Sequence, residues 1–287
     1  MANLKLGLQL GYWGALYPAN HVQLAQQAEE LGYDSVWTAE SWGNDAFTPL
    51  AWIGAHTSKI RLGTSVAQLS ARTPTSCAMA ALSIDHMSGG RMMLGLGVSG
   101  PQVVEGWYGQ PFSKPLARTR EYVDIIRQVL AREAPVTNDG PHYPLPYKNA
   151  DGWGMGKPLK PITHPRRKDL PIFLGAEGPK NVTQTAEIAD GWLPLYYSPY
   201  REEIYADQLK NAKEGFEIAG RCRIYLCRRR LHRRFAVRAF VFARKTQPGA
   251  GFRSLRNASA AGCFCAQTGS QFGGRNRRSG GLGSERI

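Results

Sequence analysis

Residues 60–98 read IRLGTSVAQLSARTPTSCAMAALSIDHMSGGRMMLGLGV and predict a strand, a helix and a second strand. The first strand is expected over 60–66. Thr73-Pro74 predicts the start of the helix, because proline is favoured at the first helical position, and Gly89-Gly90 predicts its end. The second strand is expected over 92–97. Two strands with a crossover helix between them form the unit from which parallel sheets are built.

The same unit recurs on both sides of this stretch. Leucines alternate with other residues near the N-terminus, which is the periodicity of a strand, and residues 116–132 show the apolar spacing of a helix. The expected strands are 4–10, 33–38, 60–66, 92–97, 171–175 and 191–195. The expected helices are 20–32, 46–56, 73–90, 116–132, 179–190 and 199–219. Six strand–helix units in succession predict an α/β fold with a parallel sheet.

The spacing alone fits either a doubly wound sheet or a closed barrel. A doubly wound dinucleotide-binding fold would carry G-x-G-x-x-G at its first strand–helix turn. That turn is Gly11-Tyr12-Trp13-Gly14 here, which is aromatic and bulky. The sequence therefore argues against a Rossmann phosphate loop.

The net charge of +14 belongs to the last part of the chain. Residues 1–220 carry 20 Lys and Arg against 21 Asp and Glu, whereas residues 221–287 carry 16 basic residues and one acid. We expect a barrel domain over 1–220 with an irregular insertion at 135–168, and a tail over 221–287 that is not native to the fold.

Three explanations of the Arg/Gly/Ser-rich tail are open. A shift of the coding frame near Gly220 is favoured, because arginine greatly exceeds lysine there. A basic arm could instead contact nucleic-acid phosphates. A zinc site at the four tail cysteines has poor spacing, and no metal site is expected.

The chain has no run of 18 or more apolar residues and no signal-type start. We therefore expect a cytoplasmic protein without a membrane partner.

Several motifs together resemble the luciferase-like monooxygenase superfamily, and within it the F420-dependent oxidoreductases of the mycobacterial type. The resemblance covers about residues 3–218 and implies a (β/α)8 TIM barrel, here incomplete at its C-terminal end. It also implies the deazaflavin coenzyme F420 across the carboxyl ends of the strands. The motifs are Leu6-Gly7-Leu8-Gln9, Thr38-Ala39-Glu40-Ser41-Trp42, Leu62-Gly63-Thr64-Ser65-Val66, Ser88-Gly89-Gly90-Arg91, Leu94-Gly95-Leu96-Gly97-Val98, Gly175-Ala176-Glu177-Gly178-Pro179-Lys180 and Ala189-Asp190-Gly191-Trp192.

The resemblance also implies how the ring of the cofactor is held. Glu40 matches an acid that contacts the ring and is the expected catalytic residue, although an ordinary loop carboxylate is the simpler explanation. Some members carry a histidine after this acid, and Ser41 stands there instead. The Ser65–Val66 bond matches a non-prolyl cis peptide that supports the ring. Gly63 and Gly97 would let the backbone approach it closely.

The remaining expected site residues follow later strands or line the entrance. Val98 and Ser99 match the binding segment for the cofactor tail. Helix amides near the start of a helix suit the cofactor phosphate, and the matching residues are Gly175, Ala176, Glu177, Gly178 and Lys180. A substrate pocket could be lined by Trp13, Trp42 and Trp107, for which core packing is the alternative.

The function expected is hydride transfer between F420 and a small organic substrate. An FMN-dependent luciferase-like monooxygenase is the first alternative, because both cofactors are flat tricyclic rings on a ribityl phosphate. A non-catalytic truncated family member with a nucleic-acid-binding arm is the second. We also expect a homodimer, because a barrel without its last strands leaves exposed edges that a second copy could cover.

Overall fold

The computed structural model describes residues 5–195, 197, 202–226 and 235–244, of which 202, 221–226 and 235–244 are described by backbone alone. The strands are β1 (Lys5–Gly11), β2 (Ser35–Thr38), β3 (Arg61–Thr64), β4 (Ala67–Gln68), β5 (Met92–Gly97), β6 (Ile172–Gly175), β7 (Gly191–Trp192), β8 (Glu217–Leu226) and β9 (Phe235–Arg244). The helices are α1 (His21–Glu30), α2 (Phe47–Ala55), α3 (Pro74–Met87), α4 (Pro101–Gly106), α5 (Pro115–Ala131), α6 (Pro179–Ile188) and α7 (Ala206–Leu209). Short 3-10 turns are η1 (Leu69–Ala71) and η2 (Glu202–Tyr205).

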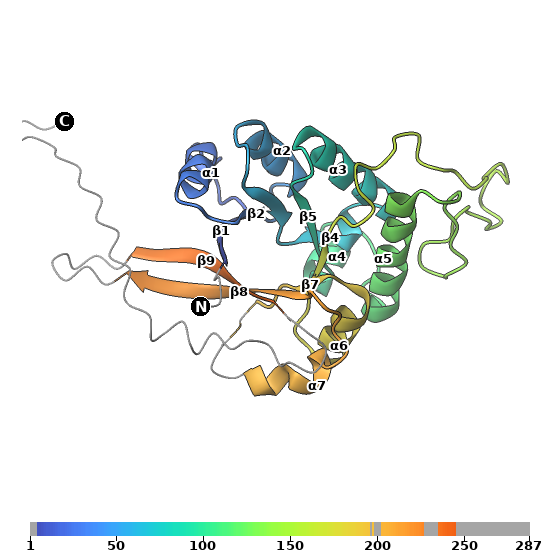
Figure 1. Cartoon of the computed structure of the whole chain (residues 1–287). Coiled ribbons are helices and arrows are strands. Elements are labelled where there is room, and N and C mark those ends of the chain that lie inside the picture. Colours follow the sequence, from blue (N-terminus) through green and yellow to red (C-terminus); the bar gives the residue numbers. More distant parts are fainter. Residues whose placement is uncertain (1–4, 196, 198–201, 227–234, 245–287) are drawn as a thin grey trace, which may run out of the picture.

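The strands are hydrogen-bonded in the order β3-β2-β1-β9-β8-β7-β6-β5-β4, and β3 also pairs with β5. The pairings therefore form a closed circuit, in which β4 lies beside the end of β5. Neighbouring strands are parallel along the run β1, β2, β3, β5, β6, β7 and β8. Strand β9 fills the gap between β8 and β1. Helices α1, α2, α3 and α5 lie outside this sheet (Figure 1). This is the α/β barrel architecture that the sequence predicts.

After β7 the chain departs from the alternation of strand and helix. β8 pairs with β7 in parallel, and β9 then returns antiparallel to pair with both β8 and β1. A hairpin thus stands where two further strand–helix units would complete a (β/α)8 barrel (Figure 1). The expected incompleteness of the pattern at its C-terminal end is confirmed. The exposed sheet edges expected there are wrong, because β9 pairs with both β1 and β8 and covers them.

The helix expected over 199–219 is wrong in its C-terminal half. Helix α7 ends at Leu209, and Gly215 has a φ of 78°, which a continuing helix does not allow. Strand β8 begins at Glu217, so the boundary expected at residue 220 falls inside a strand. The tail residues 245–287 lie outside the described residues.

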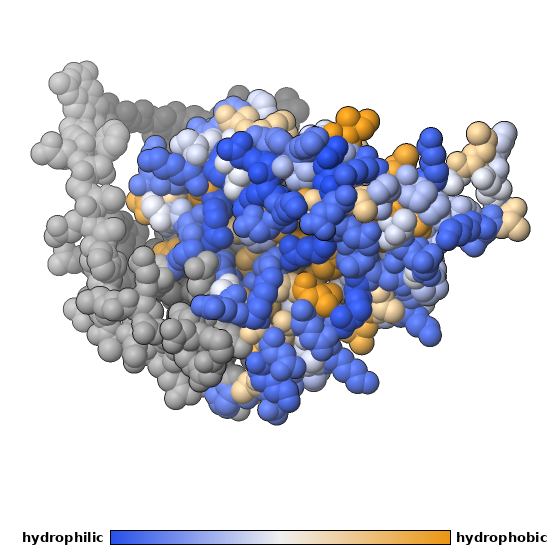
Figure 2. Space-filling model, turned by 45° about the vertical axis from the view of Figure 1, so that its right-hand side comes forward, coloured by the Kyte–Doolittle hydropathy of each residue, from blue (hydrophilic) through white to orange (hydrophobic). Residues whose placement is uncertain are grey.

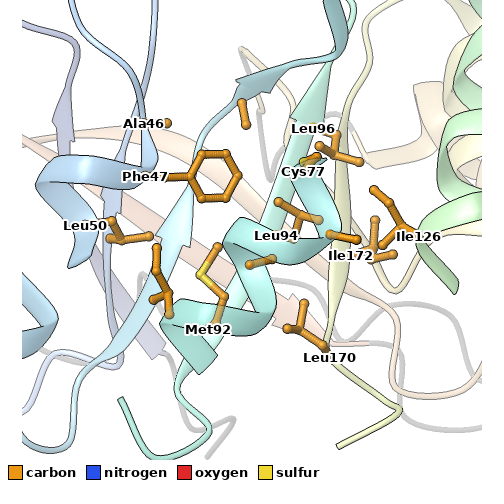
Figure 3. Packing of buried hydrophobic residues seen from close by; sticks show 14 of the residues in the cluster. Ala46, Phe47, Leu50, Cys77, Met92, Leu94, Leu96, Ile126, Leu170 and Ile172 are labelled. Carbon is orange, nitrogen blue, oxygen red and sulfur yellow. The ribbon is translucent and has the colours of Figure 1, made fainter. Parts of the chain in front are cut away.

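The main core fills the space between the sheet and the surrounding helices. Leu94 and Leu96 of β5 and Ile172 of β6 are completely buried and face α2, α3 and α5 (Figure 3). Helix α5 contributes the stripe that its spacing predicts, which consists of Tyr122, Ile125, Ile126, Val129 and Leu130. Burial of each such side chain stabilises the fold by about 1.5–3 kcal/mol.

A second, smaller core lies on the inner face of the sheet. Trp37 of β2 and Phe173 of β6 meet edge to face, with ring centroids 5.6 Å apart. A Cβ atom at Gly63 would lie 2.2 Å from the Trp37 ring, and one at Gly191 would lie 2.3 Å from the Phe173 ring. Packing against Trp37 inside the barrel therefore explains why residue 63 is glycine. The resemblance instead explains this glycine by a close approach of the backbone to the cofactor.

The segment between α5 and β6 projects away from the barrel (Figure 1). Two isolated bridges hold it, Val136 to Leu159 and Asn138 to Leu145. Two of its large apolar side chains, Trp153 and Ile162, are each 94% exposed. It is the irregular segment that the sequence predicts between the fourth and fifth strands.

The outer surface is largely hydrophilic in the view of Figure 2, with scattered apolar side chains. Exposed large apolar residues on the outer helices include Trp52 of α2, with Met79 and Met87 of α3. In the part of the chain that the structure describes, every helix is too short or too polar to cross a bilayer.

Candidate functional site

The carboxyl ends of the parallel strands bring most of the expected site residues to one edge of the barrel. We define the mouth as the loops that follow β1, β2, β3, β5, β6 and β7 at this edge. In barrels of this kind the chemistry is carried by such loops, because they can vary while the strands keep the fold.

Glu40 follows β2 and lies beneath the mouth, where Arg72 binds it. Arg72 Nη1 donates to Glu40 Oε1 at 2.8 Å, and Nη2 donates to Oε2 at 2.9 Å. The backbone amide of Ala46 donates to Oε2 at 3.1 Å, and the amide of Gln68 donates to Oε1. The Glu40 side chain is only 1% exposed. Its carboxylate therefore joins the loop after β2 to the loop after β3.

This ion pair is charge-assisted and bidentate, the strongest common geometry for a guanidinium and a carboxylate. Burial by itself lowers the pKa of Arg72, but the hydrogen bonds and the charge of Glu40 outweigh burial and raise the pKa above its usual range. The pKa of the nearby Tyr108 is also raised, first by burial and then by the charge of Glu40. Both groups therefore keep their protons at neutral pH.

The peptide bond between Ser65 and Val66 is cis, as the resemblance implies. The amide of Ser65 donates to the carbonyl of Thr38 at 2.6 Å, which ties the start of this loop to β2. Gln9 of β1 reaches across the top of the barrel, and its Nε2 donates to the Ser65 carbonyl at 3.5 Å. The cis peptide is thus held from two neighbouring strands.

The Val66 side chain lies between two strand-end glycines. A Cβ atom at Gly97 would lie 2.5 Å from Val66 Cγ2, and one at Gly175 would lie 3.2 Å from Val66 Cγ1. Any larger residue at Gly97 would push Val66 from this place. The ends of β3, β5 and β6 therefore form one packed surface at the mouth.

The loop after β5 contains Val98 and Ser99. Ser99 is exposed and has a φ of 60°, in the left-handed region that few residues other than glycine adopt. Val98 borders a hollow of about 240 Å³, which includes space open to solvent. Other walls of this hollow come from Ser70 of η1, from Phe112 in the segment before α5 and from Arg118 of α5.

The loop after β6 leads directly into α6. The Ala176 carbonyl accepts a hydrogen bond from Trp192 Nε1 at 2.7 Å, and Glu177 Oε1 accepts one from the amide of Leu195 at 2.6 Å. Gly178 is the N-cap of α6, and no side chain caps the helix amides there. Lys180 is exposed in the first turn. Free amides and a lysine at one helix start can receive an anion.

The three expected tryptophans lie on the rim of the mouth. Trp13 follows β1, packs edge to face on Tyr17 with centroids 5.0 Å apart, and is half-buried. Trp42 and Trp107 are 61% and 62% exposed, so core packing does not account for them. They offer apolar surface to a ligand.

Several residues that hold the mouth together are missed by motif reasoning. Gln68 of β4 and Arg72, just after η1, bind Glu40, and Asn44 Oδ1 accepts a hydrogen bond from the backbone amide of Trp13 at 2.8 Å. Each partner is about 30 positions away in the chain, so local spacing carries no signal for it. A buried carboxylate implies some cationic partner, but the sequence does not say which.

The described residues include no group of three or more His, Cys, Asp or Glu side chains arranged to hold a metal ion.

The sequence profile of the luciferase-like monooxygenases matches residues 8–250. The match extends past residue 220 into the segment that contains β8 and β9.

Named relatives agree with this match. A protein of Mycobacterium tuberculosis, named as a candidate coenzyme F420-dependent oxidoreductase, is 62% identical over 78% of this chain and 67% of its own length. A 5,10-methylenetetrahydromethanopterin reductase of Methanolobus tindarius is 32% identical over 69% of this chain and 55% of its own length.

Solved structures agree on the fold. The coenzyme F420-dependent tetrahydromethanopterin reductase of Methanopyrus kandleri superposes with a TM-score of 0.60 at 24% identity, over 74% of this chain and 61% of its own. The chain thus spans between about half and two thirds of the length of these three proteins. The closed strand circuit, the cis peptide at its mouth and the profile match lead to one conclusion: the chain belongs to the luciferase-like monooxygenase family.

Proposed function

We propose that the protein is an oxidoreductase that transfers hydride between coenzyme F420 and a small organic substrate. The observation that carries the proposal is the surface formed by Val66, Gly97 and Gly175 at the mouth of a luciferase-like barrel. The relative that is 62% identical is itself named for F420, which favours this cofactor over FMN.

The residues at the mouth fit a flat ring with an anionic tail. Glycines at 97 and 175 keep the surface around Val66 free of further side chains. Gln68 Oε1 is buried and has no hydrogen-bond partner among the described residues, so it can accept a bond from a ligand. We assign the ring to Ser65 and Val66, and the phosphate to Ser99, Gly178 and Lys180.

A bound deazaflavin supplies two-electron hydride chemistry. The chain contributes position and shielding. The uncapped amides at the start of α6 hold the phosphate, because the N-terminus of a helix favours negative charge. The exposed rings of Trp42 and Trp107, with Trp13, would shield a bound ring from water and offer apolar surface to the substrate.

We assign Glu40 a positioning role in this site. Its carboxylate is satisfied by Arg72 and by two backbone amides, and its side chain is 1% exposed. It therefore acts through the loops that it joins, because the Gln68 amide that it binds lies two residues after Val66. Direct contact of Glu40 with the ring, as the resemblance implies, is not needed for this role.

Fluorescence titration of the purified protein with F420 and with FMN tests the proposal. We expect saturable F420 binding that is at least tenfold tighter than FMN binding, or about 1.4 kcal/mol. Tighter binding of FMN would replace the proposal with a flavin-dependent monooxygenase. Binding of neither would contradict both functions.

A homodimer belongs to the same proposal. Trp52, Met79 and Met87 expose apolar surface on the adjacent helices α2 and α3, and burial in an interface would remove that surface from water. Sedimentation equilibrium should give twice the monomer mass. A single monomeric species at micromolar concentration would contradict the homodimer.

A further inference from the structure

Gln9 lies on the inner face of the barrel near the carboxyl edge. It is two residues before the end of β1, and its Cα is paired with that of Trp37 in β2. Its amide group reaches past β2 to the Ser65 carbonyl, the first residue after β3. The carboxamide therefore lies at the level of the mouth, beside the cis peptide.

The orientation of this carboxamide is determined by its neighbour. The Ser65 carbonyl can only accept a hydrogen bond, so the amide nitrogen of Gln9 must face it. The amide oxygen Oε1 then points elsewhere. If Gln9 Nε2 and Oε1 changed places, Oε1 would face the Ser65 carbonyl, and contact between two acceptors is unfavourable.

Gln9 Oε1 is a buried acceptor without a donor. The residue is 5% exposed, and no described group donates to this oxygen. Buried amide oxygens are normally hydrogen-bonded, because an unmatched one loses its bonds to water. An unpaired acceptor at the mouth of a ligand site indicates a donor that arrives with the ligand.

We propose that Gln9 Oε1 accepts a hydrogen bond from a ring N–H of the bound cofactor and so makes Gln9 a cofactor-binding residue. The inference rests on the proposed function, since deazaflavin rings carry an N–H group between two carbonyls. Neighbouring Ser65 and Gln9 would then serve one ring together, Ser65 by its backbone surface and Gln9 by its oxygen.

Two ligands and three proteins test this proposal. The ligands are F420 and an F420 analogue with a methyl group on the ring nitrogen, and dissociation constants are measured by fluorescence. The proteins are the wild type, Gln9→Met, which keeps the volume but removes the acceptor, and Gln27→Met, a matched change on the exposed face of α1. We expect Gln9→Met to weaken F420 binding about tenfold, and Gln27→Met to leave it unchanged.

The inference is tested by whether the effect of methylating the ring nitrogen depends on the presence of Gln9. Methylation should weaken binding to the wild type about tenfold but have little effect on Gln9→Met, because the acceptor is already gone. An equal effect of methylation on both proteins would overturn the inference and leave the proposed function standing. An unchanged F420 affinity of Gln9→Met would also overturn it. No F420 binding by the wild type would defeat both proposals.

A second measurement covers the case in which Gln9→Met does not fold. Proton NMR of the wild type with ring-¹⁵N-labelled F420 follows the N–H directly. We expect its proton to exchange with water at least tenfold more slowly than in free coenzyme, since a buried hydrogen bond protects it. Exchange as fast as in free coenzyme would overturn the inference.

Discussion

Arg72 binds Glu40 through two parallel hydrogen bonds, of 2.8 and 2.9 Å, at a place where the carboxylate is 1% exposed and the guanidinium 17%. The two residues lie in different loops of the mouth, so the ion pair fixes one loop against the other. When both partners of such a buried ion pair are replaced by apolar residues, the stability of the fold changes little. When one partner is replaced, the other is left as an uncompensated buried charge.

Replacement of Arg72 by Met should therefore lower the free energy of unfolding by about 3–5 kcal/mol. The Glu40 carboxylate would keep its backbone donors but lose both bonds to the guanidinium. Urea unfolding followed by circular dichroism measures the change.

The matched control is Arg120→Met, which breaks an ion pair with Glu187 whose side chains are 54% and 40% exposed. Here the expected loss is below about 1 kcal/mol, because solvent screens exposed pairs. Equal losses in both variants would contradict the assigned role of Arg72.

The Gly63→Ala substitution should destabilise the fold by about 1–3 kcal/mol, because the new Cβ would lie 2.2 Å from the buried Trp37 ring. Gly14→Ala is the control, because open space surrounds Gly14 and a Cβ there meets nothing within 4 Å. Thermal melts of both variants give the comparison. Similar melting temperatures for the two variants would show that residue 63 does not pack as described.

Gly63 also shows where prediction from sequence succeeds and where it stops. The strand over 60–66, the helix after Pro74 and the stripe on α5 were predictable, because their signals lie within a few residues. The reason for glycine at 63 depends on Trp37, which is 26 positions earlier and reaches it only through the register of β2 and β3. Until the strand register is known, a glycine in such a motif can therefore be explained either by contact with a cofactor or by packing against a side chain.

Strand β8 at the end of the barrel was not predicted from the sequence, for a related reason. Residues 210–219 are polar and helix-forming in part, but Ile218 and Ala219 at the start of β8 are buried, as is Phe216 just before this strand. The partners of that strand are the earlier β7 and the following β9, so its stability comes from pairing and not from local preference. At the site, the motifs placed the expected residues at strand ends, but they did not predict the partners of Glu40.

Asp190 should make stability depend on pH in the acid range. Burial raises the pKa of this carboxyl, but the charges of Arg127 and Lys213 and the amide of Ile172 outweigh burial, so the folded-state pKa is lowered. A lowered folded pKa means that the stabilisation is complete above the unfolded pKa, near 3.9, and is lost as pH falls through the folded pKa.

Asp190→Asn should therefore cost about 1–3 kcal/mol of unfolding free energy at pH 7 and progressively less below about pH 4. Urea unfolding at several pH values measures the curve. Asp139→Asn is the control, because that side chain is 92% exposed and pairs with an exposed lysine. A deficit in Asp190→Asn that stays constant down to pH 2 would contradict the lowered pKa.

The last prediction concerns the proposed cofactor surface. Gly97→Ala places a Cβ 2.5 Å from Val66 Cγ2, so Val66 must move. F420 binding should weaken about tenfold or more, because the surface that supports the ring moves with it. Gly106→Ala in α4 is the matched control, since a Cβ there meets nothing within 4 Å, and its affinity for F420 should match the wild type.

A second substitution separates a local steric effect from general loss of structure. Val66→Ala removes the methyl groups that a Cβ at position 97 would meet, so the double variant Gly97→Ala/Val66→Ala relieves the clash. If the clash is the cause, the double variant should bind F420 more tightly than Gly97→Ala alone, although each single change weakens binding. Such a non-additive result is expected only for residues in contact. Losses that simply add would contradict the clash as the cause, because the two residues would then affect binding independently.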